Sequence, residues 1–311
     1  MIISIVIITI FLIFICSILL ITISNWERNK LNVTCYEIHS PLLKKEHNFV
    51  FLSDLHEKEF GRNNSELLEK IDELDPEFIL IGGDLITVKK VHDARRYVDR
   101  DEIDVSIKLL DNLKKKYTVY YAMGNHESRL FDKAGFNDCQ NTVKYDKYIQ
   151  DITKDKALRY KRALQDVILL DDDVASFDDF DITGLTLSPE FYKSLLFKKK
   201  KKLEEEQIQS KVGKTVHGRF HIMMLHSPLY YKEAIDHGID LVLSGHFHGG
   251  SIRLPFLGAL MTPQFQFLVK ECAGKFMYKQ GTLIVSRGLG THSINIRIND
   301  LPEISFITIK P

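Results

Sequence analysis

Five apolar segments of this chain end in residues that can bind a metal ion. The segments are FVFLSDLH, ILIGGD, VYYAMGNHE, FHIMMLH and LVLSGHFH. Their closing residues are Asp54 and His56, Asp84, Asn125 and His126, His226, and His246 and His248. Carboxylate, amide and imidazole donors suit Mn, Fe and Zn, and no cysteine is among them. The pattern predicts a metal site where several strand ends meet.

Two of these groups contain residues spaced two apart, Asp54 with His56 and His246 with His248. Residues at i and i+2 of an extended chain point the same way, so we expect each pair to face one site. Glycines precede Asp84, Asn125 and His246, where they allow sharp turns after each strand. A lone histidine pair in a loop is more often a surface feature. Five donor groups at the same relative position favour the metal site.

The elements between these segments indicate how the strand ends are brought together. Helical periodicity over residues 64–75 and 101–116 separates the first three strand patterns. This order is typical of an α/β sheet with parallel crossovers, in which ligands collect outside the carboxyl ends of the strands. We also expect a helix over 144–165, two short strands within 175–187, a solvated helix over 197–207 and closing antiparallel strands at the C-terminal end. The sequence pattern of residues 128–218 does not indicate which substrate the protein binds.

The first 24 residues are uncharged and almost wholly apolar. At about 1.5 Å per residue, a helix of this length crosses a hydrocarbon core of about 30 Å. Trp26 follows, as an interfacial anchor would. A cleaved signal peptide is the alternative, but no basic residue precedes the run and no small-residue cleavage site ends it. The basic residues all follow it, which favours a single-pass protein of the cell membrane with its body on the cytoplasmic face.

Charge and cysteine content exclude two classes of protein. The 311 residues contain 42 Lys plus Arg and 42 Asp plus Glu, so no net charge attracts nucleic acid and no such polymer is expected as a partner. The four cysteines show no close pair, which argues against a disulfide framework or a zinc ribbon.

The order D-x-H, G-D, G-N-H-E, H, G-H-x-H over residues 54–248 resembles the calcineurin-like metallophosphoesterase superfamily. The N-terminal apolar run and VSRGLG, 285–290, resemble its bacterial membrane-anchored branch. The resemblance implies a four-layer α/β/β/α sandwich with two mixed sheets, preceded by one transmembrane helix. We therefore expect an anchor over residues 1–24, a linker over 25–46 and a catalytic domain over 47–311.

The resemblance also implies a role for each donor. Asp54, His56 and His248 would hold one divalent ion, and Asn125, His226 and His246 the other. Asp84 would bridge the two ions. His126 would be catalytic, lying beside the ions without binding them. The ions would be Mn, Fe or Zn, with Mn favoured.

These roles predict a membrane-anchored phosphoesterase that hydrolyses phosphodiester or diphosphate bonds with water activated by two metal ions. Its substrate would be a phosphate ester, either lipid- or nucleotide-linked, and the bilayer would be its second partner. One alternative is a diphosphatase of the same fold acting on a UDP-linked acylated sugar. Another is a binding scaffold that keeps the fold without catalysis, which should lack some of the donors.

A second set of polar residues lies outside these motifs or beside them. Glu127 either orients a ligand or faces away. His221 would point to the face opposite His226, and we interpret it as structural. Arg253 and Arg287 either contact a substrate phosphate or form structural ion pairs. We expect surface positions for four further histidines: His92, His217, His237 and His292.

Overall fold

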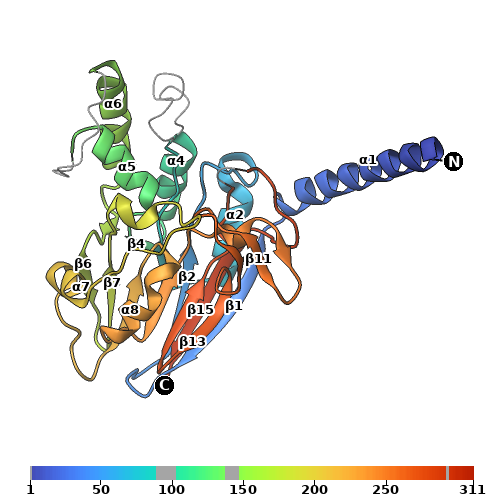
Figure 1. Ribbon diagram of the computed structural model, residues 1–311. Coiled ribbons are helices and arrows are strands. Elements are labelled where there is room, and N and C mark those ends of the chain that lie inside the picture. Colours follow the sequence, from blue (N-terminus) through green and yellow to red (C-terminus); the bar gives the residue numbers. More distant parts are fainter. Residues whose placement is uncertain (1, 89–102, 137–146, 292–293) are drawn as a thin grey trace.

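The computed structural model of the chain describes residues 2–88, 103–136, 147–291 and 294–311 (Figure 1). The helices are α1 (Ile2–Glu27), α2 (Ser65–Leu74), α4 (Asp104–Leu113), α5 (Asn125–Lys133), α6 (Lys147–Ala163), α7 (Glu205–Val212) and α8 (Tyr231–Asp236). The strands are β1 (Asn32–His39), β2 (His47–Leu52), β3 (Phe78–Ile81), β4 (Thr118–Tyr121), β5 (Ile168–Leu169), β6 (Asp173–Ser176), β7 (Phe180–Gly184), β8 (Phe220–Met224), β9 (Leu241–Ser244), β10 (Arg253–Leu254), β11 (Gly258–Met261), β12 (Phe267–Val269), β13 (Gly274–Tyr278), β14 (Gly281–Val285) and β15 (Glu303–Lys310).

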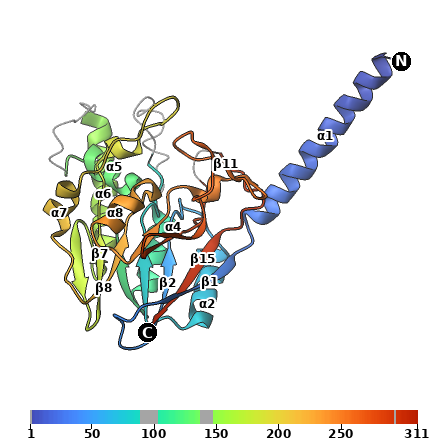
Figure 2. The ribbon, with the colours of Figure 1, turned by 60° about the horizontal axis from the view of Figure 1, so that its bottom comes forward.

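Two six-stranded mixed sheets form the centre of the body (Figures 1 and 2). The first has the order β1-β15-β2-β3-β4-β5, and the second the order β13-β14-β9-β8-β7-β6. Within them β2, β3 and β4 run parallel to one another, as do β7, β8 and β9. A small three-stranded sheet, β10-β11-β12, is separate from both. The α/β fold with two mixed sheets is therefore confirmed.

Alternation along each strand explains how the sheets are buried on both faces. In β2, Phe49 and Phe51 pack into the cluster between the two sheets. Val50 and Leu52 turn to the other face and pack with the helices. Both faces of a parallel sheet are covered in such folds, so its strands are apolar throughout rather than alternating with polar residues. This explains the continuous apolar runs that end in the metal-binding residue types.

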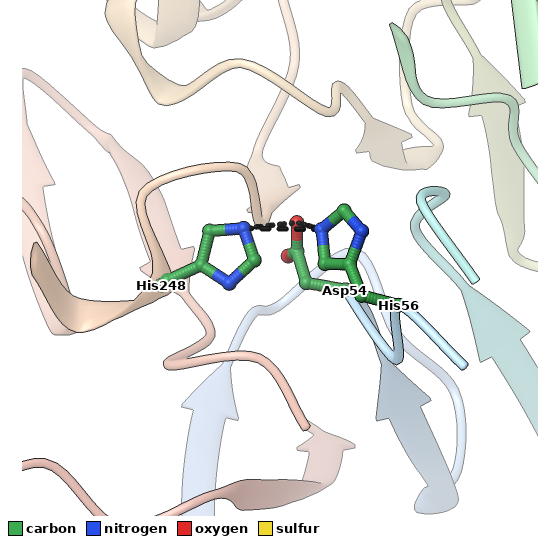
Figure 3. Close-up of side chains that lie close together, drawn as sticks. All are labelled: Asp54, His56 and His248. Carbon is green, nitrogen blue, oxygen red and sulfur yellow. Dashed lines mark hydrogen bonds and ion pairs between the residues drawn. The ribbon is translucent and has the colours of Figure 1, made fainter. Parts of the chain in front are cut away.

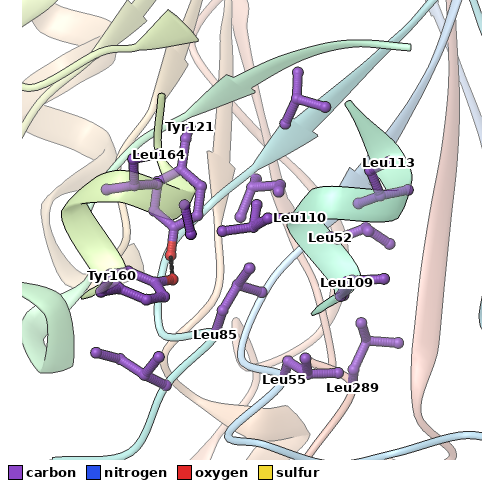
Figure 4. Packing of buried hydrophobic residues seen from close by; sticks show 14 of the residues in the cluster. Leu52, Leu55, Leu85, Leu109, Leu110, Leu113, Tyr121, Tyr160, Leu164 and Leu289 are labelled. Atoms are coloured by element: carbon purple, nitrogen blue, oxygen red, sulfur yellow. Dashed lines mark hydrogen bonds between the residues drawn. The ribbon is translucent and has the colours of Figure 1, made fainter. Parts of the chain in front are cut away.

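Helices cover the outer face of each sheet. Apolar residues of α2, α4, α5 and α6 form one cluster with the first sheet. Figure 4 shows part of it, including Leu109 and Leu110 of α4 and Tyr160 of α6. Residues of α7 and α8 form another with the second sheet. The four layers are thus helix, sheet, sheet and helix, as the resemblance implies.

Three segments differ from the sequence-based expectations. Residues 25–46, expected as a linker, include β1, which pairs in parallel with β15 along its whole length. The predicted helix over 197–207 begins only with Glu205, because the lysines pair with other segments instead: Lys200 with Glu233 and Lys201 with Glu190. The closing strands are not uniformly antiparallel, since β14 runs parallel to β9.

Helix α1 projects from the body (Figures 1 and 2). It is long and apolar enough to cross a membrane, and its apolar window is fully exposed. Its last turn contacts the body, because the Ser24 hydroxyl accepts the N–H of Arg297 at 3.0 Å and the Glu27 carboxylate accepts the N–H of Asp300 at 3.0 Å.

Candidate metal centre

The predicted donors come together at the carboxyl ends of the central strands. Asp54 and His56 follow β2, Asp84 follows β3, and Asn125 begins α5 after β4. In the second sheet the donors after β8 and β9 are His226, His246 and His248. All seven side chains are buried. Each sheet thus supplies part of one polar cluster.

The backbone reaches this arrangement by a route that the i, i+2 spacing does not predict. Asp54, His56, Asp84, His246 and His248 all have positive φ, between 47° and 66°. The segments after β2 and β9 are therefore tight left-handed turns, not extended strands. Such conformations are uncommon for residues with a Cβ and cluster at functional sites. The paired side chains face one site because of these turns.

One trio consists of Asp54, His56 and His248 (Figure 3). The Nε2 atoms of His56 and His248 lie 3.2 Å apart, and Asp54 Oδ1 lies 3.4 Å from His248 Nε2 and 3.7 Å from His56 Nε2. Nδ1 of His248 donates to the carbonyl oxygen of Gly290 at 3.1 Å. In the neutral ring, this leaves the Nε2 lone pair of His248 directed at the cluster.

A second trio consists of Asp84, His226 and His246. Nδ1 of His226 donates to the carbonyl oxygen of Gly82 at 2.7 Å, which again points Nε2 at the cluster. That Nε2 lies 3.0 Å from Asp84 Oδ2, where the two form an ion pair when His226 is protonated. Asp84 Oδ2 also lies 4.0 Å from His56 Nε2, so this carboxylate stands between the two trios.

Four buried atoms of the cluster have no hydrogen-bond partner among the described residues: Asp54 Oδ1, Asn125 Oδ1, His226 Nε2 and His246 Nε2. Buried polar atoms are nearly always satisfied, and leaving one unpaired costs about 1–3 kcal/mol. Oxygen and imidazole nitrogen are ligands that divalent transition metals accept. The cluster therefore fits metal ions, which would satisfy all four atoms at once.

The charges in the cluster are consistent with this fit. Burial raises the pKa of the Asp54 and Asp84 carboxyls, but the neighbouring imidazoles, chiefly His248 and His226, outweigh it and hold both pKa values below the usual range. Burial lowers the pKa of His246 to about 3. Both carboxylates are thus ionised, and His246 is neutral, which are the forms that bind metals.

His226 behaves differently from His246. Burial opposes its charge, but the carboxylates of Asp84 and Asp54 raise its pKa to about 10. Without an ion, a proton therefore compensates the two carboxylates at neutral pH. Metal binding at this position must release that proton.

His126 lies beside the donors, and a backbone contact sets which nitrogen of its neutral ring carries the proton. Its Nδ1 accepts the N–H of Val88 at 2.7 Å, and the Arg129 guanidinium lies 3.5 Å from the same atom. In the neutral ring the proton therefore resides on Nε2. Nε2 lies 4.0 Å from Asp84 Oδ2, at the edge of the cluster.

Glu127 faces the loops that carry the donors and orients them. Of the two sequence-based alternatives, orienting a ligand or facing away, the structure therefore favours the first. Its buried carboxylate accepts the N–H groups of Asp84 and Leu85 at 2.9 Å each, and that of Gly124 at 3.1 Å. The hydroxyl of Tyr121 donates to it at 2.7 Å. Burial, and then the charge of Asp84, raise the pKa of Glu127 to about 7.

Sequence reasoning missed two polar side chains that lie close to the motifs. The Thr87 hydroxyl lies 3.1 Å from Nδ1 of His56. The Arg129 guanidinium donates to the carbonyl oxygen of Val88 at 2.7 Å. Thr87 comes three residues after the G-D motif and Arg129 two residues after the G-N-H-E motif, so their closeness to a motif in the chain was the available signal.

A third missed side chain is Tyr192. Its ring meets that of His246 edge to face, with centroids 5.0 Å apart. It also lines the pocket at the cluster. Nothing in the sequence marks this tyrosine, because it comes from the region 128–218, whose pattern reveals no specificity.

A pocket of about 660 Å³ opens onto the cluster. Its other wall is largely apolar and comes from Ile252 and residues 260–265 together with Ile294 and Ile296. This volume suits a small-molecule substrate. The polar wall includes His56, Asp84, Asn125, His126, His246 and His248.

The two arginines left open by the sequence have partners outside the cluster. Arg253 donates to Cys272 Sγ at 3.0 Å. Arg287 lies 3.3 Å from the Glu303 carboxylate. Both therefore have structural contacts.

The histidines outside the motifs are not donors of the cluster where the structure describes them. His221 is buried against the carbonyl oxygen of Val216, as expected for a structural residue. His217 is exposed, as predicted. His237 was expected at the surface but is buried, because its Nε2 lies 2.9 Å from the carbonyl oxygen of Gly213. Two more lie outside the described residues: His92 and His292.

Comparison with known proteins places the chain in a family. Residues 47–250 match the calcineurin-like phosphoesterase model. The chain is 24% identical over 263 residues to the uncharacterized metallophosphoesterase YkoQ of Bacillus subtilis, a match that covers 85% of this chain and 83% of YkoQ. It is 26% identical over 291 residues to the uncharacterized metallophosphoesterase Cj0846 of Campylobacter jejuni, covering 89% of this chain and 63% of that protein.

A shorter match is closer in sequence. The chain is 38% identical over 93 residues to the uncharacterized metallophosphoesterase YkuE of Bacillus subtilis, which covers 29% of this chain and 31% of YkuE. The family model spans the strand-end motifs and most of both sheets. The chain therefore belongs to the calcineurin-like phosphoesterase family and is a metal-dependent phosphoric ester hydrolase.

Proposed function

We propose that the chain is a membrane-anchored phosphoesterase with a binuclear metal centre that hydrolyses phosphodiester or diphosphate bonds. Asp54, His56 and His248 would hold one ion, and Asn125, His226 and His246 would hold the other. Asp84 would be shared between them. The observation that carries this proposal is the set of four buried donor atoms that lack a hydrogen-bond partner within one cluster of the described residues.

The metal ions would polarise phosphate oxygens and acidify water for attack on phosphorus. Mn²⁺ is our preferred ion among Mn, Fe and Zn, all of which accept a mixed oxygen and imidazole donor set without thiolate. The chain's own contribution at the leaving group comes from His126, whose Nε2–H lies beside the cluster. In this role Nε2–H donates a hydrogen bond that stabilises the negative charge on the leaving oxygen as the phosphate bond breaks, and the oxygen then takes its proton from water. The contacts of Nδ1 with Val88 and Arg129 keep the ring proton on Nε2.

Two variants test the assignment in the full chain, purified in detergent with Mn²⁺. Asp84→Asn removes one of the charges that the ions require, so we expect loss of both bound metal and hydrolysis of bis-p-nitrophenyl phosphate. His126→Ala leaves the donor set intact, so we expect full metal content and a rate lower by about 10²–10⁴-fold. His217→Ala, at an exposed histidine outside the motifs, is the matched control.

Elemental analysis separates the outcomes. Metal retained in Asp84→Asn at the wild-type ratio would contradict the bridging role. Wild-type turnover in His126→Ala would contradict the catalytic role without affecting the metal assignment.

The membrane part of the proposal assigns residues 1–24 as the anchor and residues 47–311 as the catalytic domain. Strand β1, which precedes residue 47, pairs with β15 in the first sheet of that domain. The exposed apolar surface of α1 supports it. The basic residues Arg28 and Lys30, which follow α1, favour a cytoplasmic body. We expect the full chain to sediment with membranes and to resist protease added outside intact cells. Recovery in the soluble fraction argues against the anchor, and digestion from outside against the orientation.

A further inference from the structure

The small sheet β10-β11-β12 and the segments beside it expose large apolar side chains. Phe256 is the extreme case, with 99% of its surface exposed. Soluble proteins seldom expose apolar groups of this size together, and when they do the surface usually binds a partner or a membrane. We name as the apolar rim six residues whose exposed fractions run from 46% to 99%: Phe256, Leu257, Phe265, Phe267, Leu268 and Ile294.

The apolar rim borders the pocket at the metal cluster. Phe265 and Ile294 line that pocket, as do the apolar side chains of Leu260 and Ile296. A substrate whose phosphate reaches His246 therefore has its remaining part beside apolar side chains. None of the predicted metal ligands belongs to the apolar wall of the pocket, which Phe265, Ile294, Leu260 and Ile296 line.

The apolar rim is also joined to the end of α1. The last turn of α1 holds the backbone of Arg297 and Asp300 through two side-chain contacts. One residue after Arg297, the carbonyl oxygen of Ile298 accepts the N–H of Arg253 at 3.0 Å, at the start of β10. Figures 1 and 2 both show β11 on the side of the body from which α1 leaves.

A second segment reaches the same region from the middle of the chain. The N–H of Leu195 donates to the carbonyl oxygen of Gln264 at 2.8 Å, next to Phe265 in the chain. Two residues after Leu195, Phe197 is 99% exposed, and the lysines at 198 and 199 that follow it are exposed too. Aromatic side chains next to lysines are typical of surfaces that lie in the interface of an anionic bilayer.

We propose that the apolar rim, together with Phe197, docks on the bilayer that α1 spans. The mouth of the pocket at the metal cluster then lies at the membrane surface. The pocket then receives amphiphilic phosphate esters, with the phosphate at the metal cluster and the apolar part along Phe265 and Ile294. The docking rests on the proposed membrane span, and the substrate class rests on the proposed phosphoesterase function. The two parts are therefore tested by separate measurements.

Docking is measured by tryptophan quenching, because the chain has one tryptophan, Trp26. The full chain carrying Trp26→Phe and Phe256→Trp is reconstituted into vesicles of phosphatidylglycerol and phosphatidylcholine with brominated acyl chains. We expect strong quenching relative to unbrominated vesicles. The control carries Trp26→Phe and Met277→Trp, at a side chain 62% exposed on β13 of the second large sheet, and should remain unquenched.

Quenching at position 256 no greater than at position 277 would overturn the docking. The docking would also be overturned if the emission of the Phe256→Trp variant responded to protein concentration and not to bromine, since a second copy of the chain would then cover the apolar rim. Neither readout depends on catalysis.

The substrate class is measured with hexadecyl p-nitrophenyl phosphate in vesicles and bis-p-nitrophenyl phosphate in solution. The double variant Phe256→Ser/Phe267→Ser changes rim residues that do not line the pocket. We expect its KM for the amphiphile to rise roughly tenfold as apolar contact with the interface is lost, with unchanged kinetics on the soluble diester.

Equal losses on both substrates would mean that the variant disturbs the site, and an unchanged KM would mean that the apolar rim does not deliver substrate. Either result overturns the substrate part. If the wild type hydrolyses neither ester, the proposed function fails, and the quenching result still decides whether the apolar rim docks.

Discussion

Glu127 holds together the two loops that carry Asp84 and Asn125. Its carboxylate accepts N–H groups from the loops after β3 and β4 and is fully buried. Removing one partner of a buried charged network leaves the other groups unsatisfied. The stability of this corner thus depends on a residue outside the predicted ligand set.

We expect Glu127→Ala to lower the free energy of unfolding by about 3 kcal/mol, because three backbone donors and the Tyr121 hydroxyl lose their acceptor. Glu127→Gln keeps the shape and one oxygen, so its loss should be smaller. Urea unfolding of the metal-free chain measures both. Equal stability of Glu127→Ala and wild type would show that water satisfies these donors.

At the residue scale, the predicted Asp and His donors lie in groups that could hold a metal ion, although one further group joins His126 to His56 and Asp84. Asp54, His56 and His248 form the expected trio, but left-handed turns bring them together, and strand alternation does not. A single sequence carries little signal for such turns at Asp and His, since their stability comes from the surrounding structure. The role of each donor as a ligand stays a prediction.

Gly124 shows why the loop after β4 can pass so close to the loop after β3. Its φ of −89° is open to any residue, so conformational freedom is not the reason for glycine here. A Cβ at this position would lie 2.2 Å from Asp84 Oδ1 and 2.6 Å from the Asp84 nitrogen. The sequence-based explanation, a sharp turn, is therefore wrong for Gly124, and close approach replaces it.

We expect Gly124→Ala to displace Asp84 and to reduce metal content and hydrolysis together by at least about tenfold, of the order seen when groups that orient metal ligands are lost. Gly213→Ala is the control, because no atom lies within 4 Å of the added Cβ although its φ of 77° strains the backbone. Elemental analysis and diester hydrolysis check the result. Normal metal content in Gly124→Ala would contradict it.

The pair Asp181 and Arg219 joins β7 to the segment before β8, with nitrogen–oxygen distances of 2.8 and 2.9 Å. Burial raises the pKa of Asp181, but Arg219 outweighs it and the net shift of the pKa is downward. Because the pKa of Asp181 is lower in the folded state, its ionisation stabilises the folded state at pH values above the unfolded-state pKa of about 3.9. This stabilisation is lost as the pH falls through the lower folded-state pKa.

We therefore expect Asp181→Asn to be less stable than wild type at pH 7 and to approach it below about pH 4. Urea unfolding of both proteins at pH 7 and at a pH below about 4 measures this difference in stability. A difference that does not change with pH would show that the carboxylate charge contributes nothing. The His221 ring, which lies 3.5 Å from Asp181, is present in both proteins.

Elements with a strong period were predictable, and elements that depend on distant partners were not. Helix α2 and the strands β2 and β3 appear where the apolar pattern indicated. β1 was missed because its residues NVTCYEIH are half polar, and only pairing with β15, at the other end of the chain, makes them a strand. The lysine run was mistaken for helix because its acidic partners lie in other segments.

At the scale of the whole molecule, Arg297 connects α1 to the metal centre. Its buried guanidinium donates to the carbonyl oxygen of Gly290 at 2.7 Å and pairs with Asp300 at 3.1 Å. Gly290 is also the acceptor for His248, and Ser24 of α1 accepts the N–H of Arg297. One residue thus joins the projecting helix to a predicted metal ligand.

We expect Arg297→Met to cost about 3–5 kcal/mol of unfolding free energy, because it removes the nearest charged partner of the buried Asp300 and leaves Arg287 Nη1 at 4.0 Å. Arg159→Met is the matched control, at an exposed pair with Asp104, and should cost less than about 1 kcal/mol. Denaturant unfolding in detergent measures both. An equal loss of unfolding free energy in the two variants would show that the buried Arg297–Asp300 pair stabilises the protein no more than an exposed pair does.

The donors come from both sheets, with Asp54 and His246 separated by 192 positions along the chain. Bound ions would therefore act as a clasp between two sheets whose strands do not pair with each other in the described part of the chain. Such a clasp adds stability in proportion to the logarithm of metal concentration. A chelator should lower the melting temperature of the wild type and leave that of Asp84→Asn unchanged, so the supply of metal in the cell would set the lifetime of the enzyme as well as its rate.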